Sequence, residues 1–276
     1  MLRLLTIEFH KLKHNRASKV LSIIYFALLT SIALIAAIKF DIGPIKFHLA
    51  EQGIFNFPYI WHFNSFIAAF LKFFLLLVIV SMMANEYSYK TLKQNLIDGL
   101  SKKEFILSKF YTVIIFSLFS TLFIFFISLI LGFIYSDFNE FSIILSGLEY
   151  LLAYFIKLIG FFSMGLFFGI LIKRSAFAVG AIVVFFFIEF FSYIYFVNKF
   201  TEEAVNNIYQ FFPFKSMWDL IKEPFTRLGA VKSVANQIGE NFTKDYSVGL
   251  LNIIIVLLWT SFFIYASYFL LKKRDL

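Results

Sequence analysis

The sequence predicts an all-α integral membrane protein with six transmembrane helices, an N-terminal interfacial helix and a helical outer segment between the fifth and sixth spans. Hydrophobic residues make up 61% of the 276 residues and charged residues only 15%, whereas soluble proteins carry about 25% charged residues. So few polar side chains could not cover the surface of a soluble fold. The chain also contains six apolar runs that can each cross a bilayer, so residues 1–276 are interpreted as a single transmembrane domain.

The sequence lacks the motifs of several classes of function. It has no Cys and only four His, and none of the His forms an H-E-x-x-H pattern, so no metal site is predicted. No G-x-x-x-x-G-K-[ST] loop is present, and the chain is therefore not expected to hydrolyse ATP or to hold a cofactor. The formal charge of +8 is spread between apolar runs, which fits membrane topology better than binding of nucleic acid.

Residues 1–19 are the first predicted element, an amphipathic helix. Its apolar stripe at helical spacing consists of Leu2, Leu5, Phe9 and Leu12. Basic residues dominate the second half of this segment and give the helix a polar rim. Such a helix is expected to lie in the inner membrane interface with its cations toward anionic lipid headgroups. The alternative is a basic leader that only sets the topology.

Residues 20–197 hold the first five spans, and residues 250–276 hold the sixth span and a tail. A bilayer core of about 30 Å needs roughly 20 apolar residues in a helix. The runs that meet this requirement are residues 20–38, 64–84, 110–135, 150–172, 176–197 and 250–271. With the N-terminus inside, 15 of the 25 basic residues fall in the inner segments and eight in the outer ones. The positive-inside rule therefore places both termini in the cytoplasm.

An inner helical hairpin is predicted between the second and third spans. Asp98 and Gly99 are typical of a helix end, because Gly accepts the left-handed conformation. Ser101 and Glu104 then match a capping box that starts a new helix. From 102 to 135 this helix has 34 residues, about 51 Å at 1.5 Å per residue, so it projects beyond the bilayer. A rigid hairpin of this kind suits force transmission from a soluble partner; the alternative is a solvated charged loop.

The segment 85–110 resembles the hallmark segment of type-2 ATP-binding-cassette permeases, in the lantibiotic-immunity-like branch. The family pattern has an acidic residue, a Thr, Leu positions, a small or Pro residue, a Ser–basic pair and a Lys before the next span. The residues that fill it are Glu86, Thr91, Leu92, Leu96, Gly99, Ser101, Lys102 and Lys109. Gly99 stands where the family often has Pro. The leader E-F-H-K-L-K-H-N-R also resembles the family's opening.

The resemblance implies a permease subunit of an exporter that moves a hydrophobic or amphipathic substrate, either a peptide or a lipid-like molecule. ATP would be hydrolysed on a separate ATP-binding-cassette ATPase subunit. A second permease subunit, identical or different, is also implied, as is a location among the lipids of a bacterial inner (plasma) membrane. The segment 91–98 would contact the ATPase, and Glu86 would tie the second span to its surroundings. The implied coupling residues are Glu86, Thr91, Leu92, Lys93, Leu96 and Asp98.

The outer segment 198–249 is predicted to contain short amphipathic helices that lie on or dip into the outer membrane face. Thr201 can cap a helix whose first turn holds two Glu residues. Ser216 with Asp219 offers a second start. A partly ordered loop is the alternative.

Three charged residues lie inside predicted spans at a shared depth, about 10–12 Å below the outer boundary. They are Lys72, Lys157 and Glu189. Charges in a span usually face the bundle interior and pair with one another, so Glu189 is expected to pair with one of the lysines. The alternatives are lysines that snorkel outward separately, or a cluster that holds an anionic headgroup of the cargo or of a lipid.

Gly165 and Gly169 form a G-x-x-x-G pattern in the fourth span. Small residues at this spacing allow two helices to approach closely. The pattern is expected to serve packing within one subunit, and a seam between two subunits is the alternative.

Two other functions compete with the transporter. Glu202 and Glu203 resemble the paired glutamates of the CAAX-protease-like family of intramembrane hydrolases, but position 207 is Asn where that family has Arg. A membrane channel or assembly factor that works without an ATPase is the second rival. Copurification distinguishes them, because only a permease is expected to retain a soluble protein with Walker motifs.

Overall fold

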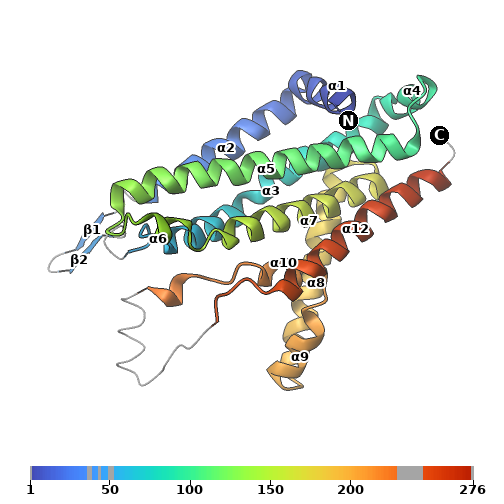
Figure 1. Cartoon of the computed structure of the whole chain (residues 1–276). Coiled ribbons are helices and arrows are strands. Elements are labelled where there is room, and N and C mark those ends of the chain that lie inside the picture. The colour runs from blue at the N-terminus through green and yellow to red at the C-terminus, as the bar shows by residue number, and fades with distance from the viewer. Residues whose placement is uncertain (1, 36–38, 43–44, 49–52, 229–244, 275–276) are drawn as a thin grey trace.

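The computed structural model describes residues 2–35, 39–42, 45–48, 53–228 and 245–274. Within these residues, long helices form a bundle with a small two-stranded ribbon at one end (Figure 1). The elements in chain order are α1 (Leu2–His14), α2 (Arg16–Ile35), β1 (Lys39–Ile42), β2 (Ile45–His48), α3 (Tyr59–Ser88), α4 (Thr91–Ile97), α5 (Lys102–Tyr135), α6 (Phe141–Leu145), α7 (Glu149–Ile172), α8 (Ser175–Val197), α9 (Glu202–Tyr209), α10 (Pro213–Asp219), the 3-10 helix η2 (Phe225–Arg227) and α12 (Leu250–Lys273).

Among the described residues, five helices are long and apolar enough to cross a membrane. They are α3, α5, α7 taken together with α6, α8 and α12. These helices overlap the residues of the predicted second to sixth spans. The predicted first span, residues 20–38, overlaps α2, which has 20 residues, and residues 36–38 lie outside the described part of the chain. The first span, which would bring the total to six, therefore stays a prediction.

The prediction of an all-α protein needs one correction, because β1 and β2 form an antiparallel ribbon after α2. The register pairs Lys39 with His48 and Ile42 with Ile45. In both strands polar and apolar residues alternate along the chain, K-F-D-I and I-K-F-H, which is the period of a strand and not of a helix. The segment was too short to stand out beside the long apolar runs.

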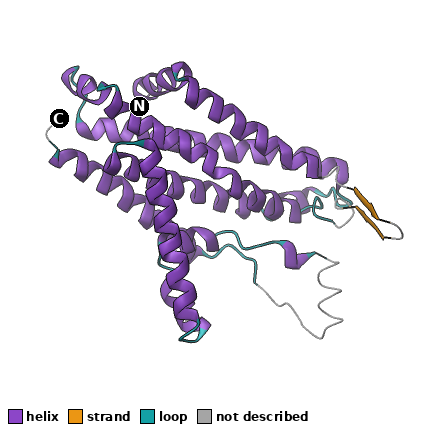
Figure 2. Ribbon diagram, turned by 180° about the vertical axis from the view of Figure 1, so that it is seen from behind, coloured by secondary structure: helices purple, strands orange, loops and turns teal. Residues whose placement is uncertain are grey.

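α7 occupies the centre of the bundle, where it packs against α3, α5, α8 and α12. In its most apolar stretch 72% of the residues are buried inside the chain, against 17% for α8. Both views of the ribbon show α8 leaving the direction of the other long helices (Figures 1 and 2). Its large side chains, such as Phe187 and Phe191, are consequently exposed.

Two glycines bring α7 close to α3. A Cβ at Gly165 would overlap the side chain of Leu76, and a Cβ at Gly169 would lie 3.0 Å from Cβ of Met83. Leu76 and Met83 both belong to α3, so the G-x-x-x-G face packs within the same chain. By contrast, nothing lies within 4 Å of a Cβ placed at Gly180 on α8.

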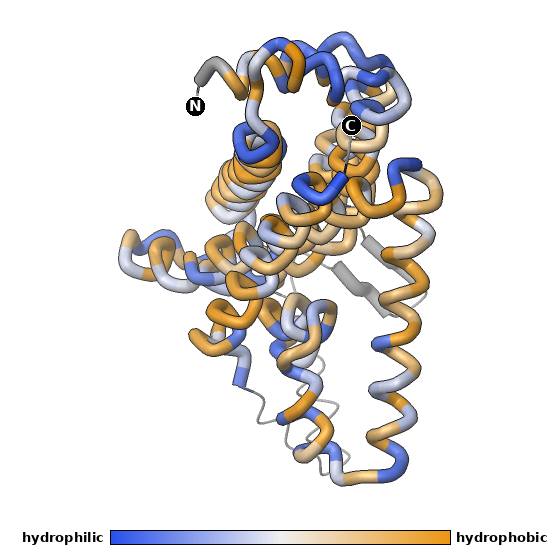
Figure 3. Tube along the Cα trace, turned by 90° about the vertical axis from the view of Figure 1, so that its right-hand side faces the viewer, coloured by the Kyte–Doolittle hydropathy of each residue, from blue (hydrophilic) through white to orange (hydrophobic). Residues whose placement is uncertain are grey.

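Hydrophilic residues gather at the end of the molecule that carries the labelled N and C, while the helices are apolar along most of their length (Figure 3). α1, α4 and the last turns of α12 lie at this end, and the β1–β2 ribbon lies at the opposite end (Figure 1). We refer to the first of these as the α4 end.

Where the structure describes the outer segment, it contains the short helices α9, α10 and η2 joined by turns and loops, and 229–244 lie outside the described residues. α9 begins after Thr201 with both Glu residues in its first turn, as predicted, but the Thr201 side chain makes no capping hydrogen bond. The second predicted start is wrong: α10 begins at Pro213, not at Ser216. Pro is well suited to the first helical position, because its missing N–H would have no partner there. Ser216 instead lies buried inside the helix and donates to the carbonyl oxygen of Pro213, 3.0 Å away.

Candidate coupling site

The chain between α3 and α5 turns twice to form a compact hairpin around α4. Lys90, with φ 58°, and Gly99, with φ 94°, both adopt left-handed conformations at the two turns. The N–H of Leu100 donates to the carbonyl of Asn95 at 3.0 Å, and the N–H of Gly99 donates to that of Leu96 at 3.2 Å. These two bonds form a Schellman motif, which satisfies the last carbonyls of α4. The predicted helix end at Asp98 and Gly99 is confirmed.

A capping box starts α5. The N–H of Glu104 donates to Oγ of Ser101 at 3.2 Å, and the N–H of Ser101 donates to the Glu104 carboxylate at 3.0 Å. The predicted capping box is confirmed, and so is the predicted length of the helix, which runs from Lys102 to Tyr135. The hairpin therefore consists of two long helices joined through a short one that is fixed at both ends.

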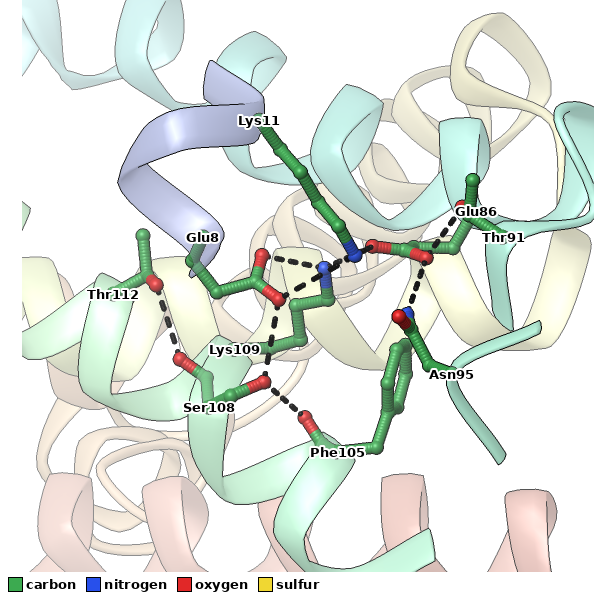
Figure 4. Close-up of polar contacts among 9 residues, drawn as sticks. All are labelled: Glu8, Lys11, Glu86, Thr91, Asn95, Phe105, Ser108, Lys109 and Thr112. Atoms are coloured by element: carbon green, nitrogen blue, oxygen red, sulfur yellow. Dashed lines mark hydrogen bonds and ion pairs between the residues drawn. The ribbon is translucent and has the colours of Figure 1, made fainter. Parts of the chain in front are cut away.

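Glu86, near the end of α3, is the centre of a buried polar cluster (Figure 4). It is only 2% exposed. Its carboxylate accepts from Nζ of Lys109 at 2.5 Å, from Nζ of Lys11 at 2.8 Å and from Oγ1 of Thr91 at 2.6 Å. A longer bond of 3.4 Å comes from the Asn95 amide. Glu86 thus connects its own helix to α1, α4 and α5.

Lys109 is shared between two carboxylates. Its side chain is fully buried, and its Nζ lies 2.6 Å from Glu8 of α1 and 2.5 Å from Glu86. Glu8, itself 2% exposed, also accepts a 3.4 Å bond from Oγ of Ser108. Lys11 and Lys109 balance the two carboxylates, so the cluster is electrically neutral. Neutral pairing is what makes burial of Glu8, Glu86 and Lys109 tolerable, since an unpaired buried charge is costly; Lys11 is partly exposed.

Glu86 and Lys109 could be identified from the sequence, but the role of Glu8 and Lys11 was not predicted. A signal for Glu8 was available. It lies three residues after Leu5 and four before Leu12, so it shares the apolar stripe of the amphipathic helix. A carboxylate on a stripe that packs inward requires a partner. The identity of that partner depended on how α1 folds over α3 and α5, which the local sequence does not specify.

The six coupling residues divide by the direction in which they face. Glu86 and Thr91 belong to the buried cluster, Leu92 is 2% exposed, and Leu96 packs against the core. Lys93 and Asp98 are exposed. Two further residues, which were not predicted to contribute, are also largely exposed: Tyr89 at 71% and Ile97 at 75%. α4 therefore presents a mixed apolar and charged face away from its own chain.

The predicted pairing of Glu189 with a lysine is replaced by a different contact. The Glu189 carboxylate accepts the backbone N–H of Phe214 at 3.2 Å and of Lys215 at 2.6 Å, so it satisfies the first turn of α10. No ion pair joins it to Lys72 or Lys157 among the described residues. The physical reason is that the outer segment folds back onto α8 and supplies backbone donors within reach of Glu189.

The two lysines contact aromatic rings instead. Nζ of Lys72 lies 4.6 Å from the centroid of the Phe161 ring, and Nζ of Lys157 lies 5.9 Å from that of Trp218. Lys157 is 2% exposed, and Lys72 is half-buried. Each lysine of the predicted cluster therefore lies against an aromatic ring, and the glutamate binds backbone N–H groups of α10.

The residues of this hairpin lie within a match to a known protein family. A family model described as ABC-2 family transporter protein matches residues 4–192. The match contains α4 and all four charged residues of the Glu86 cluster. No match was found among curated proteins.

Proposed function

The chain belongs to the ABC-2 family of transporter proteins, whose model matches well over half of its length, and we propose that it is the permease subunit of an exporter driven by a separate ATPase. Membership makes it a multi-pass membrane protein with a transport role and no catalytic role of its own. Permeases of this family generally work with an ATP-binding-cassette ATPase subunit. The partner, the substrate and the topology of this chain are proposals.

The outward face of α4 is the observation that carries the proposal. Tyr89 and Ile97 are 71% and 75% exposed beside Lys93 and Asp98. Exposed apolar side chains rimmed by charges mark sites of protein contact. α4 lies at the end of the bundle that carries both labelled termini (Figure 1), where hydrophilic residues gather (Figure 3) and a soluble protein has access. This face suits an ATPase subunit, and the buried residues of α4 hold it in place.

The Glu86 cluster offers a path by which movement of α4 would reach the membrane helices. Thr91 and Asn95 connect α4 to Glu86, and Lys109 connects Glu86 to α5 and to Glu8 of α1. A displacement of α4 would therefore move α1, α3 and α5 together. In this proposal ATP binding and hydrolysis on the partner change the position of α4, and the cluster passes that change to the spans.

The proposed topology places the α4 end in the cytoplasm, with six spans in the plasma membrane of a bacterium. The excess of basic residues in the inner segments supports this orientation. α2 is the first of the six spans in this proposal, because its 20 residues correspond to about 30 Å of helix. α1 then lies along the inner interface, where Lys13 and His14 are exposed to the headgroup region.

A second permease subunit completes the transporter in this proposal. Six spans are half of the membrane unit that the family resemblance implies, and α8 has the least buried surface of the five spans. We assign the chain to the lantibiotic-immunity-like branch, as the segment around Thr91 and Ser101 suggests. The cargo would be a hydrophobic or amphipathic molecule, such as a peptide or a lipid-like compound.

Copurification tests the proposal directly. The chain is extracted from its native cells, and the soluble proteins that remain bound are examined for Walker motifs. Lys93→Glu and Ile97→Asp should each retain about tenfold less of such an ATPase, since a hot-spot residue contributes more than about 1.4 kcal/mol. Lys199→Glu and Ile208→Asp are matched controls on exposed residues of the opposite side, and they should retain the normal amount.

The same experiment weighs the alternatives. A chain that retains no protein with Walker motifs would favour a channel or assembly factor that works without an ATPase. Equal retention by Lys93→Glu, Ile97→Asp and their controls would remove α4 from the contact. No observation in the structure favours an intramembrane hydrolase: Glu202 and Glu203 are both exposed in the first turn of α9.

A further inference from the structure

Lys72 on α3 and Lys157 on α7 are two cations in the spanning part of the bundle that have no acidic partner. Among the described residues, neither ammonium group takes part in a hydrogen bond or ion pair. Each lies against an aromatic ring, that of Phe161 for Lys72 and that of Trp218 for Lys157. Their charges repel one another. Charged side chains within spans normally face a partner or a water-filled cavity, so this pair calls for an anion from outside the chain.

The carboxylates on the neighbouring elements are already committed. Asp219, whose charge acts on Lys157, accepts from Nζ of Lys215 with both oxygens, at 2.7 and 2.6 Å. Glu189 accepts the two backbone N–H groups at the start of α10. Neither carboxylate is free to neutralise the two lysines without giving up its present contacts. The positive charge at Lys72 and Lys157 is therefore not balanced locally.

An exposed aromatic surface borders the two ammonium groups. The Trp218 ring lies 6.0 Å from that of Phe70, and the Phe73 ring lies 5.3 Å from that of Phe161, centroid to centroid. Trp218, Phe70 and Phe73 are 47%, 50% and 46% exposed. Cations with an apolar, aromatic surface beside them match both ends of an amphiphile that has an anionic headgroup.

We propose that Lys72 and Lys157 bind the anionic headgroup of an amphiphile, whose apolar chain lies against Phe70, Phe73 and Trp218. The amphiphile is either an anionic lipid of the bilayer or a freely exchanging molecule of the same chemistry, such as the cargo. The cargo form rests on the proposed export function and narrows its substrate class to anionic amphiphiles. The lipid form does not depend on that function.

Trp218 reports on this site through fluorescence quenching by brominated probes in vesicles that contain the full chain. One experiment compares brominated phosphatidylglycerol with brominated phosphatidylcholine, and a second compares brominated dodecyl phosphate with brominated dodecylphosphocholine. The difference between the wild type and Trp218→Phe isolates the Trp218 signal from the other two Trp residues. In at least one experiment the anionic probe should quench Trp218 more than its zwitterionic counterpart does.

The lysines must account for that excess quenching. Each of Lys72→Met and Lys157→Met should lose part of it, and the double variant should lose all of it. Lys72→Arg with Lys157→Arg should keep it, and Lys222→Met, which removes a lysine bonded to the carbonyl of Asp245, should also keep it. Because the single variants suffice, the test does not require the double variant to fold.

The outcomes identify the source of the amphiphile. Lysine-dependent excess quenching by phosphatidylglycerol alone supports a bilayer lipid, and excess quenching by dodecyl phosphate supports an exchanging amphiphile. Equal quenching by the anionic and zwitterionic probes in both experiments would overturn the proposal, as would an excess that survives in the double Met variant. No ATPase is present in the vesicles, so the result is independent of whether an ATPase binds the chain.

Discussion

At the scale of single residues, the burial of the charged Lys109 side chain depends on the two carboxylates beside it. It is fully buried between the carboxylates of Glu8 and Glu86. Glu86→Gln would leave too little negative charge for Lys109 and Lys11, and removing one partner of a buried ion pair costs about 3–5 kcal/mol. We expect a lower midpoint of thermal unfolding in detergent. Lys109→Met in the same chain should partly restore the midpoint, because it removes the excess positive charge from the cluster.

Glu140→Gln is the matched control for this change, since Glu140 is exposed at the start of α6 and no side-chain hydrogen bond caps that helix. Its midpoint should stay at the wild-type value. A Glu86→Gln chain as stable as the Glu140→Gln chain would show that the cluster contributes little to the fold. Failure of Lys109→Met to restore any stability would indicate that Glu86 acts through Thr91 and Asn95 instead.

Single residues also show where sequence-based prediction ends. Glu86 could be identified because it stands in a patterned segment with Thr91 five positions later, which is local information. Glu189 could be identified as a buried charge, but its partners could not, since they are backbone N–H groups of Phe214 and Lys215. Those donors come within reach only because the chain after α8 folds back, and no local pattern encodes that return.

At the scale of helices, the packing of α7 on α3 can be tested with two glycines. Gly165→Ala places a Cβ where the side chain of Leu76 lies, and overpacking of this kind typically costs about 1–3 kcal/mol. Gly180→Ala meets no atom within 4 Å, and Ala is favoured over Gly in a helix by about 0.5–1 kcal/mol. We therefore expect the unfolding midpoint to fall for Gly165→Ala and to stay equal or rise for Gly180→Ala.

The pair of substitutions is matched, because both replace Gly by Ala within an apolar helix. Equal midpoints for the two variants would mean that α3 and α7 are further apart in the membrane than in the structure. A loss of stability at Gly180 instead would indicate that a second subunit covers that face of α8, which the single chain leaves open.

The predicted helices were correct where the signals were local. The length of the apolar run indicated that α5 crosses the membrane. Its start was indicated by Ser101 and Glu104, which lie three residues apart and form the capping box. The β1–β2 ribbon and the start of α10 were not predicted. A short alternating segment carries a weak signal beside runs of 20 apolar residues, and Pro213 was interpreted as punctuation although it occupies the first helical position.

At the scale of the whole molecule, the orientation of the bundle is the prediction on which the coupling proposal depends. α4 and the turn between α7 and α8 should face the cytoplasm, and α9 should face outward. The chain has no Cys, so single cysteines report without background. Suitable exposed positions are Lys93, Arg174 and Glu203. Arg174 is preferred to Lys173, because Lys173 has a φ of 65° that a Cys would adopt with strain.

In intact cells, a membrane-impermeant maleimide should label the cysteine at 203 and leave those at 93 and 174 unlabelled, while permeabilised cells should label all three. The physical basis is the positive-inside rule, because the α4 end carries most of the basic residues. Labelling at 174 with protection at 203 would invert the molecule and put α4 outside the cell, where no ATPase could reach it. Protection at both 174 and 203 would mean instead that α8 does not cross the membrane. In that case α8 would lie along one membrane surface, which would explain why so little of this helix is buried against its own chain.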